Sequence, residues 1–334
     1  MSAAIREQIT REFGVEPICI NSARVSAQNR QRLYWVGKRN ADGTYTQVPV
    51  EQPKDRGIML HDILDHGVPM QEKSYCLTAT EYKGSSIEHT LQKHVRTQIA
   101  EPIRIGTINS TAKNKSFDSQ QYRVYSPDGK SVTLCGQGGG VSAKTGLYAV
   151  PIHATDKPHP IPVYEVSNSL ITIGDEQYPI KLADGFYIIR KLTVSECKRL
   201  QTVPDYYKFP VSDTQAYKML GNGWTVDVIA HILSYCTGIT SKSLNVLSMY
   251  DGMSCGRLAL QKLGGQVDSY FATEIDKYAI QTTQHNFPDT IQMGDAFQVR
   301  DNHWEIPNLH KGDHRCQDRA NVPLLAKEEQ RMYL

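Results

Sequence analysis

An alternation of expected strands and helices over residues 244–295 constrains the fold more than any other feature of the sequence. The first two strands are each followed by a turn and then by a helix-length segment. Strands are expected at 244–250, 267–272 and 290–293, and helices at 257–263 and 276–285. Because parallel strands need crossover connections, this βαβαβ pattern predicts half of a doubly wound, Rossmann-like α/β sheet.

The residues before this block fall into two segments of different composition. Residues 1–39 predict a helix at 4–13, a strand at 17–21 and a buried strand at 32–37. Residues 40–185 are rich in Gly, Ser, Thr, Pro and Lys and carry few helix signals, so we expect an inserted β-rich domain there. Its short alternating segments include 75–78, 122–125 and 131–134.

Helices return after the insertion. They are expected at 193–203, 212–220 and 225–235, followed by a linker at 237–243. After residue 301 the alternation of strands and helices ends, and we expect an irregular polar tail with one short helix near 324–333. The expected divisions are 1–39, 40–185, 186–240, 241–301 and 302–334. We expect the sheet to be assembled from both ends of the chain.

Composition excludes several classes of protein. Charged residues make up 22% of the 334 residues and hydrophobic residues 40%, as in a globular protein. The net charge is only +2, so contact with nucleic acid requires a local basic surface. No apolar run approaches the roughly 18 residues of a membrane span, and the N-terminus lacks a signal-peptide pattern. The 7 cysteines are scattered without a C-x-x-C pair, which favours a reducing cytoplasm and argues against disulfides or a zinc site.

The 244–295 block carries residues suited to an adenosine-bearing cofactor. A glycine turn at Gly252 lets the backbone approach a ligand at the start of the following helix. Glu274, 22 positions later, lies close to the spacing of about 20 residues at which an acid binds ribose hydroxyls. Asp295 ends the third strand and could accept from an adenine amino group. The alternative is a tight turn with a solvated strand-end acid, and the absence of G-x-G-x-x-G disfavours NAD and FAD.

Two arginines mark the N-terminal segment. Arg30 and Arg32 are two positions apart at the start of an expected strand, so their side chains share one face. Two guanidinium groups held together suit a phosphate and a base carbonyl. A solvated basic strand edge is the alternative.

Several segments together resemble the DNA cytosine-5 methyltransferases of the phage or restriction–modification type. Gln28, Arg30 and Arg32 are similar to the Q-x-R-x-R motif of that family, and Gly221-Asn222-Gly223 is similar to its last motif. Thr193 to Pro204 resembles the motif that braces the recognition domain. Residues 246–295 resemble the first motifs. The late motifs therefore precede the early ones, which indicates a permuted order.

The resemblance implies a site for S-adenosylmethionine. Tyr250 would pack against adenine, Glu274 would bind ribose and Asp295 adenine, while Asn222 would help to hold the methionine part. If so, Asn222 folds back beside Gly252 although it precedes it in the chain. The cofactor-binding set implied by the resemblance is Tyr250, Asp251, Gly252, Glu274, Ile275, Asp295 and Asn222.

The resemblance also implies duplex DNA as the substrate. Arg32 would lie by a flipped target cytosine and Arg30 nearer the DNA backbone, the two catalytic residues that the motif provides. Residues 40–185 occupy the place of the target recognition domain. Its basic residues and a glycine loop at 136–140 suit backbone contacts; the basic residues are Lys83, Lys93, Arg96, Arg104, Lys115, Arg123 and Lys144. A bacterial or phage-infected cytoplasm is the expected location.

Two motifs of the family do not occur in the sequence. Its nucleophile is a Cys in a Pro-Cys loop, and the partner is a Glu in Glu-Asn-Val. Cys316 follows Arg315 instead of Pro, and the polar residues 309–314 do not predict a buried strand before it; Ala320 stands where the Glu is needed. The chain is thus an enzyme completed by a second chain that supplies Cys and Glu, a catalytically dead remnant that binds DNA and cofactor, or an unrelated nucleotide-dependent enzyme.

Overall fold

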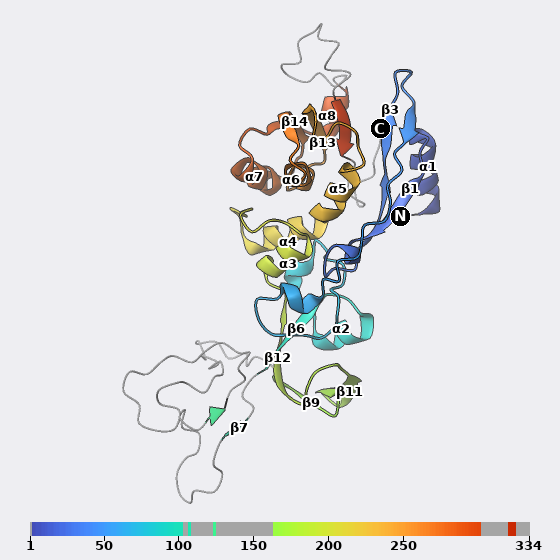
Figure 1. Cartoon of the computed structure of the whole chain (residues 1–334). Helices are drawn as coiled ribbons and strands as arrows, with labels where there is room; N and C mark the ends of the chain where they lie inside the picture. The colour runs from blue at the N-terminus through green and yellow to red at the C-terminus, as the bar shows by residue number, and fades with distance from the viewer. Residues whose placement is uncertain (1, 103–105, 108–122, 125–162, 302–319, 325–334) are drawn as a thin grey trace, which may run out of the picture. The chain divides into compact units, whose positions relative to one another are not determined.

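The structure is a computed structural model that describes residues 2–102, 106–107, 123–124, 163–301 and 320–324 (Figure 1). The chain forms two compact units. Unit 1 contains Met1–Met59, Cys76–Lys83 and Val194–Leu334, and unit 2 contains Leu60–Tyr75 and Gly84–Thr193. Unit 2 therefore begins at Leu60, further along the chain than the expected boundary at residue 40, and Cys76–Lys83 belongs to unit 1. Within the described ranges, no helix combines the length and apolar character that crossing a membrane requires.

The strand–helix alternation of residues 244–295 is present in unit 1 as a parallel sheet. Its order is β15-β14-β13-β16, and each neighbouring pair is parallel. The strands are β13 Ser243–Met249, β14 Gln266–Thr273, β15 Ile291–Gly294 and β16 Ala320–Leu324. The helices that follow the first three strands are α6 Cys255–Lys262, α7 Lys277–Asn286 and α8 Ala296–Asp301. The carboxyl ends of the parallel strands share one edge, where an α/β sheet holds its ligands.

Strand β16 corrects the expectation of an irregular tail over 302–334. It pairs with β13 in the registers Asn245↔Ala320 and Leu247↔Pro323. Pro323 cannot donate a backbone hydrogen bond, which fits the end position of β16 in the sheet order. Such a short strand with a proline gives a weak sequence signal. The expected helix near 324–333 and the polar segment 309–314 lie outside the described residues.

The N-terminal strands do not join the parallel sheet, contrary to our expectation of one sheet built from both chain ends. β1 Pro17–Asn21 pairs with β2 Gln31–Trp35 in an antiparallel, two-stranded sheet of its own. The strand expected at 32–37 is only half-buried. Helix α1 (Ala3–Phe13) lies next to it, and a small core of Ile9, Phe13 and Val15 packs against Trp35 of this strand. The neighbouring short elements are η1 Ser22–Arg24, β3 Gly37–Arg39 and β4 Tyr45–Gln47.

Three helices of the 194–233 region complete unit 1. They are α3 Val194–Leu200, α4 Asp213–Asn222 and α5 Val226–Leu233. Helix α5 is buried at nearly every position and packs against α6, although 21 residues lie between the two helices in the chain (Figure 1). The Tyr207 hydroxyl also donates to the Met253 carbonyl at 2.7 Å. The helical segment that precedes the parallel sheet thus packs onto its first crossover.

The described residues of unit 2 form an antiparallel sheet and one α-helix. The strand order is β11-β10-β9-β12-β6-β5, and the core includes Ile87, Ala100, Ile171 and Tyr187. The elements are η2 Leu60–Ile63, β5 Val68–Pro69, α2 Ile87–Lys93, β6 Gln98–Pro102, β9 Val163–Ser167, β10 Leu170–Ile173, β11 Glu176–Pro179 and β12 Gly185–Lys191. Strands β7 Gly106–Thr107 and β8 Arg123–Val124 pair separately.

Of the three short strands expected in the insertion, one is absent from the structure and one lies outside the described residues. Residues 75–78 form no strand; they lead into the 3-10 helix η3 (Glu81–Lys83) of unit 1. Residues 131–134 lie outside the described part of the chain. The third, expected at 122–125, corresponds to β8.

A buried carboxylate joins three distant segments of unit 1. Asp227 at the start of α5 is 3% exposed and binds Arg56 and Lys262. We expect Asp227→Ala to lower the free energy of unfolding by about 2 kcal/mol, because two charge-assisted hydrogen bonds are lost while both cations regain water. Urea unfolding followed by circular dichroism measures this effect.

The matched control is Asp268→Ala, which removes an exposed carboxylate of β14. Its effect should stay within about 0.5 kcal/mol. Equal destabilisation by the two substitutions would contradict the role given to Asp227.

Candidate functional site

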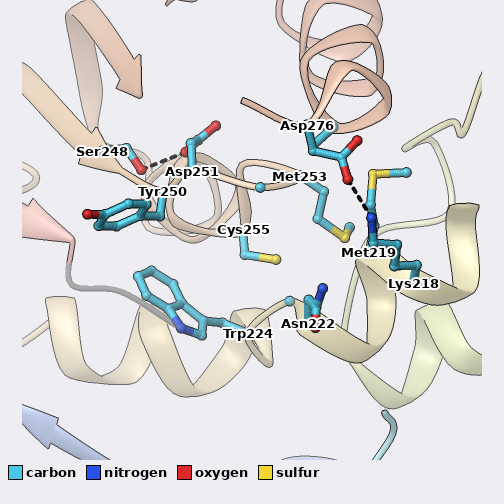
Figure 2. A pocket seen from close by; sticks show the side chains of 13 residues that line it. Lys218, Met219, Asn222, Trp224, Ser248, Tyr250, Asp251, Met253, Cys255 and Asp276 are labelled. Atoms are coloured by element: carbon cyan, nitrogen blue, oxygen red, sulfur yellow. Dashed lines mark hydrogen bonds and ion pairs between the residues drawn. The ribbon is translucent and has the colours of Figure 1, made fainter. Parts of the chain in front are cut away.

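A hollow lies at the carboxyl end of β13, between two segments far apart in the sequence (Figure 2). One wall comes from the end of α4 and the turn after it, and the other from β13, the following turn and the start of α7. The lining residues are Lys218, Met219, Asn222, Gly223, Trp224, Ser248, Tyr250, Asp251, Gly252, Met253, Cys255, Asp276 and Ala279. The structure therefore brings Asn222 and Gly252 into one site.

The turn after β13 takes backbone conformations that are rare for residues other than glycine. Tyr250 has φ 54°, Gly252 φ 60° and Ser254 φ 57°. The Tyr250 amide donates to Thr273 Oγ1 at 3.1 Å and the Asp251 amide to the Thr273 carbonyl at 3.0 Å, so β14 holds this turn in place. Left-handed conformations at bulky residues persist where the surroundings enforce them, and they concentrate at ligand sites.

The side chain of Asp251 stabilises the same turn. Its carboxylate accepts hydrogen bonds from Ser248 (2.6 Å), from Ser254 and from the Tyr270 hydroxyl (2.8 Å). Burial raises the pKa of Asp251, and the three hydroxyl donors oppose that rise. Asp251 thus lines the hollow, as expected of a cofactor-binding residue, but its carboxylate is engaged in bracing the turn that carries Tyr250.

Glu274 connects the end of β14 to the same turn. One carboxylate oxygen accepts from the Gly252 amide at 2.7 Å, and the other accepts from the amides of Ile275 and Asp276, both at 2.9 Å. Glu274 does not line the hollow itself. Because a carboxylate offers about four lone-pair positions, the side chain retains acceptor capacity for a ligand hydroxyl.

Ile275 and Asp295 also lie outside the lining of the hollow. Ile275 is 69% exposed, and the Asp295 carboxylate caps α8 by accepting from the Phe297 amide at 2.9 Å. Both follow the carboxyl ends of their strands, at the sheet edge that also carries the turn after β13.

The turn that carries Asn222 is held by two buried side chains. Arg30 donates to the carbonyls of Gly221 (3.3 Å, from both terminal nitrogens) and Gly223 (3.1 Å). Gln201 donates to the carbonyls of Leu220 at 2.6 Å and Gly223 at 3.3 Å. Three backbone carbonyls, two before Asn222 and one after it, therefore accept hydrogen bonds from side chains outside the helix.

Gly221 is also fixed by packing. A Cβ atom at this position would stand 2.1 Å from the carbonyl group of Thr78, so only glycine fits against that peptide. Arg30 reaches the same segment through the Leu77 carbonyl at 3.0 Å and the Cys76 sulfur at 3.1 Å. Residues 76–83 and the 221–223 turn thus pack against each other, and the Arg30 guanidinium binds both.

These contacts correct the role expected for Arg30. Its side chain is 6% exposed, and burial, with a smaller contribution from Arg32, lowers its pKa. Backbone carbonyls occupy the guanidinium, so it is not placed to bind a phosphate in this structure. We assign Arg30 to positioning of the 221–223 turn.

Arg32 remains the candidate for contact with the target base. It lies on β2, is half-buried, and donates to the Gln31 carbonyl at 2.8 Å and to the Cys76 sulfur at 3.5 Å. Both arginines contact Cys76, so they share one face as their spacing predicts.

Sequence reasoning assigned no role to several lining residues. Trp224 directly follows the Gly-Asn-Gly motif, and Lys218 precedes Asn222 by four positions, hence on the same helical face. Asp276 follows Glu274 by two positions and caps α7. These three could have been found from spacing alone.

The expected basic surface is described only in part. Lys93 is an exposed residue of α2, and Arg96 donates to the Gly84 carbonyl; Lys83 ends η3. The side chains of Arg104, Lys115, Arg123 and Lys144, the loop 136–140 and Cys316 lie outside the described residues. Among the described residues, no cluster of His, Cys, Asp and Glu could hold a metal ion.

Comparison with known proteins gives one family. A sequence profile described as "C-5 cytosine-specific DNA methylase" matches residues 10–237. Type II methyltransferase M.HhaI of Haemophilus parahaemolyticus is 27% identical over 211 residues, which cover 61% of this chain and 47% of that protein. Type II methyltransferase M.HpaII of Haemophilus parainfluenzae is 26% identical over 218 residues, covering 65% and 49% respectively.

A plant protein matches a shorter stretch. DNA (cytosine-5)-methyltransferase DRM2 of Arabidopsis thaliana is 31% identical over 91 residues, which cover 27% of this chain and 14% of the plant protein. The chain spans about half the length of the Haemophilus relatives that it matches.

Separate substitutions distinguish the two arginines. Arg30→Ala should lower the free energy of unfolding by about 3 kcal/mol, because it leaves several buried carbonyls without donors. Arg32→Ala should change stability by less than about 1 kcal/mol, since its side chain is only half-buried. Chemical unfolding of both variants measures the difference.

Arg30→Lys is the informative second variant. It keeps the charge but presents all its donors from one nitrogen atom and lacks the planar fork whose two terminal nitrogens reach the carbonyls, so the free energy of unfolding should fall less than in Arg30→Ala. Similar losses for Arg30→Ala and Arg32→Ala would contradict the positioning role of Arg30.

Proposed function

We propose, from the premise that the chain belongs to the C-5 cytosine-specific DNA methylase family, that it carries the cofactor site and the target-base arginine of a DNA cytosine-5 methyltransferase. The methyl donor of the family is S-adenosylmethionine. The observation that carries the proposal is the two-sided hollow. One wall, 218–224, lies within the matched residues 10–237, and the other, 248–279, lies beyond them.

The side chains around the hollow suit the parts of this cofactor. Tyr250 and Trp224 present aromatic rings to the hollow (Figure 2), which suit an adenine or an adjacent apolar surface. Glu274 is the acceptor for ribose hydroxyls, Asp295 for the adenine amino group, and exposed Ile275 adds apolar contact. Asn222 faces the methionine part from the opposite wall.

The proposed substrate is a cytosine flipped out of duplex DNA. Arg32 is the residue that we propose beside the target base. Unit 2 corresponds to much of the segment proposed for target recognition, with exposed Lys93 as one candidate for contact with the DNA backbone. The type II relatives from Haemophilus favour a role in restriction–modification in a bacterial or phage-infected cell.

Transfer to carbon five requires a thiolate at ring carbon six and an acid at ring nitrogen three. Since the sequence has neither Pro-Cys nor Glu-Asn-Val, we propose that a second chain supplies both groups. The competing proposal is a remnant that binds DNA and cofactor without catalysis. Methyl-transfer measurements with and without a complementing chain separate the two.

Cofactor binding tests the first part of the proposal. Glu274→Ala should weaken S-adenosylmethionine binding by about 1–3 kcal/mol, because it removes the ribose acceptor and frees the Gly252 amide. Isothermal titration calorimetry measures the change. Glu12→Ala, an exposed glutamate of α1, is the matched control and should bind as the wild type does. Unchanged affinity in Glu274→Ala would refute this assignment.

Methyl transfer tests the second part. The purified chain alone should incorporate no tritiated methyl into duplex DNA, and addition of a chain carrying the Pro-Cys and Glu-Asn-Val motifs should restore incorporation. A 5-fluorocytosine duplex should then trap the covalent adduct on the added chain. Robust incorporation by the lone chain, abolished by Cys316→Ser, would instead make Cys316 the nucleophile.

A further inference from the structure

The hollow has two chemically different ends. Figure 2 shows the rings of Tyr250 and Trp224 at one end, and Lys218 with Asp276 at the other. The Lys218 ammonium lies 2.8 Å from the Asp276 carboxylate, and the two side chains are 45% and 28% exposed. The hollow is therefore aromatic at one end and carries both signs of charge at the other.

The ion pair is formed by residues from opposite walls. Lys218 lies on α4, one turn before Asn222, and Asp276 is the N-cap of α7. Asp276 also accepts from the Tyr278 amide at 2.9 Å, which fixes the orientation of its carboxylate. The Lys218 ammonium has three donors, of which the Asp276 carboxylate takes one, so it can donate to a second acceptor at the same time.

The Lys218–Asp276 ion pair contributes little to the stability of the fold. Partly exposed ion pairs contribute about 0–1 kcal/mol, because side-chain entropy and solvent screening offset their attraction. A charged pair facing a hollow can instead recognise a ligand that carries both charges. The α-amino-acid end of S-adenosylmethionine is such a group, with a carboxylate and an ammonium on one carbon atom.

We propose that Lys218 and Asp276 form the subsite for the amino-acid end of the cofactor. Lys218 donates to the α-carboxylate and Asp276 accepts from the α-ammonium, while the adenosine part extends toward the aromatic end. The proposal rests on the proposed function, since it deepens the same site. It explains selection of a whole S-adenosyl amino acid over smaller adenosine compounds.

The experiment compares two ligands on the full chain by calorimetry. S-adenosylhomocysteine has the amino-acid end, and 5′-methylthioadenosine shares the thioadenosine part but lacks it. Lys218→Gln should weaken binding of S-adenosylhomocysteine about tenfold or more, the loss expected for one charge-assisted hydrogen bond, and leave binding of 5′-methylthioadenosine unchanged. Asp276→Asn, which retains an N-cap residue, should show the same pattern.

Two variants control for structure and for charge. Lys218→Arg keeps a cationic donor and should recover much of the lost affinity for S-adenosylhomocysteine. Lys277→Gln removes a neighbouring exposed positive charge and should bind both ligands as the wild type does. Thermal melting of every variant checks that the fold is retained.

The outcomes separate this inference from the proposed function. If wild type binds S-adenosylhomocysteine and Lys218→Gln binds it equally well, the subsite is refuted and the cofactor site stands. If Lys218→Gln weakens both ligands equally, the ion pair only ties α4 to α7, and the subsite is again refuted. If the wild type binds neither ligand, the cofactor site itself is refuted, and the subsite with it.

Discussion

The buried Arg30 guanidinium is the interaction on which the candidate site depends. A charged side chain is stable in a protein interior only when its donors are met, and here carbonyls of the 76–78 segment and the 221–223 turn meet them. The hydrogen bonds are directional, so they fix the backbone on both sides of Asn222. Rigidity at that turn places one wall of the hollow opposite the turn after β13.

The two walls of the hollow come together whatever their order in the chain. The 218–224 wall precedes the 248–279 wall in sequence, yet the two meet because α5 packs on α6 and Asp227 binds both Arg56 and Lys262. A site assembled by packing needs only that its walls reach each other in space. The reversed order that the sequence indicates for the two motif blocks is therefore compatible with the single hollow that both segments line.

The sequence predicted the parts of the fold that depend on local pattern. Strands β13, β14 and β15 and helices α6 and α7 follow from apolar segments punctuated by glycine, and the Gly-Asn-Gly motif located one wall. Strand β16 was missed because its partner, β13, lies about 75 positions away and its own signal includes Pro323. The burial of Arg30 was missed for a similar reason, since its acceptors are backbone carbonyls that no side-chain pattern reveals.

The segment Cys76–Lys83 has a consequence for domain exchange. The chain passes between the two units after residues 59, 75, 83 and 193, so unit 2 is not one continuous insertion. A graft that replaced residues 60–193 with a homologous region would also replace the Thr78 peptide against which Gly221 packs and the acceptors at Cys76 and Leu77. An exchange of residues 60–193 in this chain must therefore preserve the eight residues Cys76–Lys83 in the middle of the exchanged region, or the 221–223 turn loses its support.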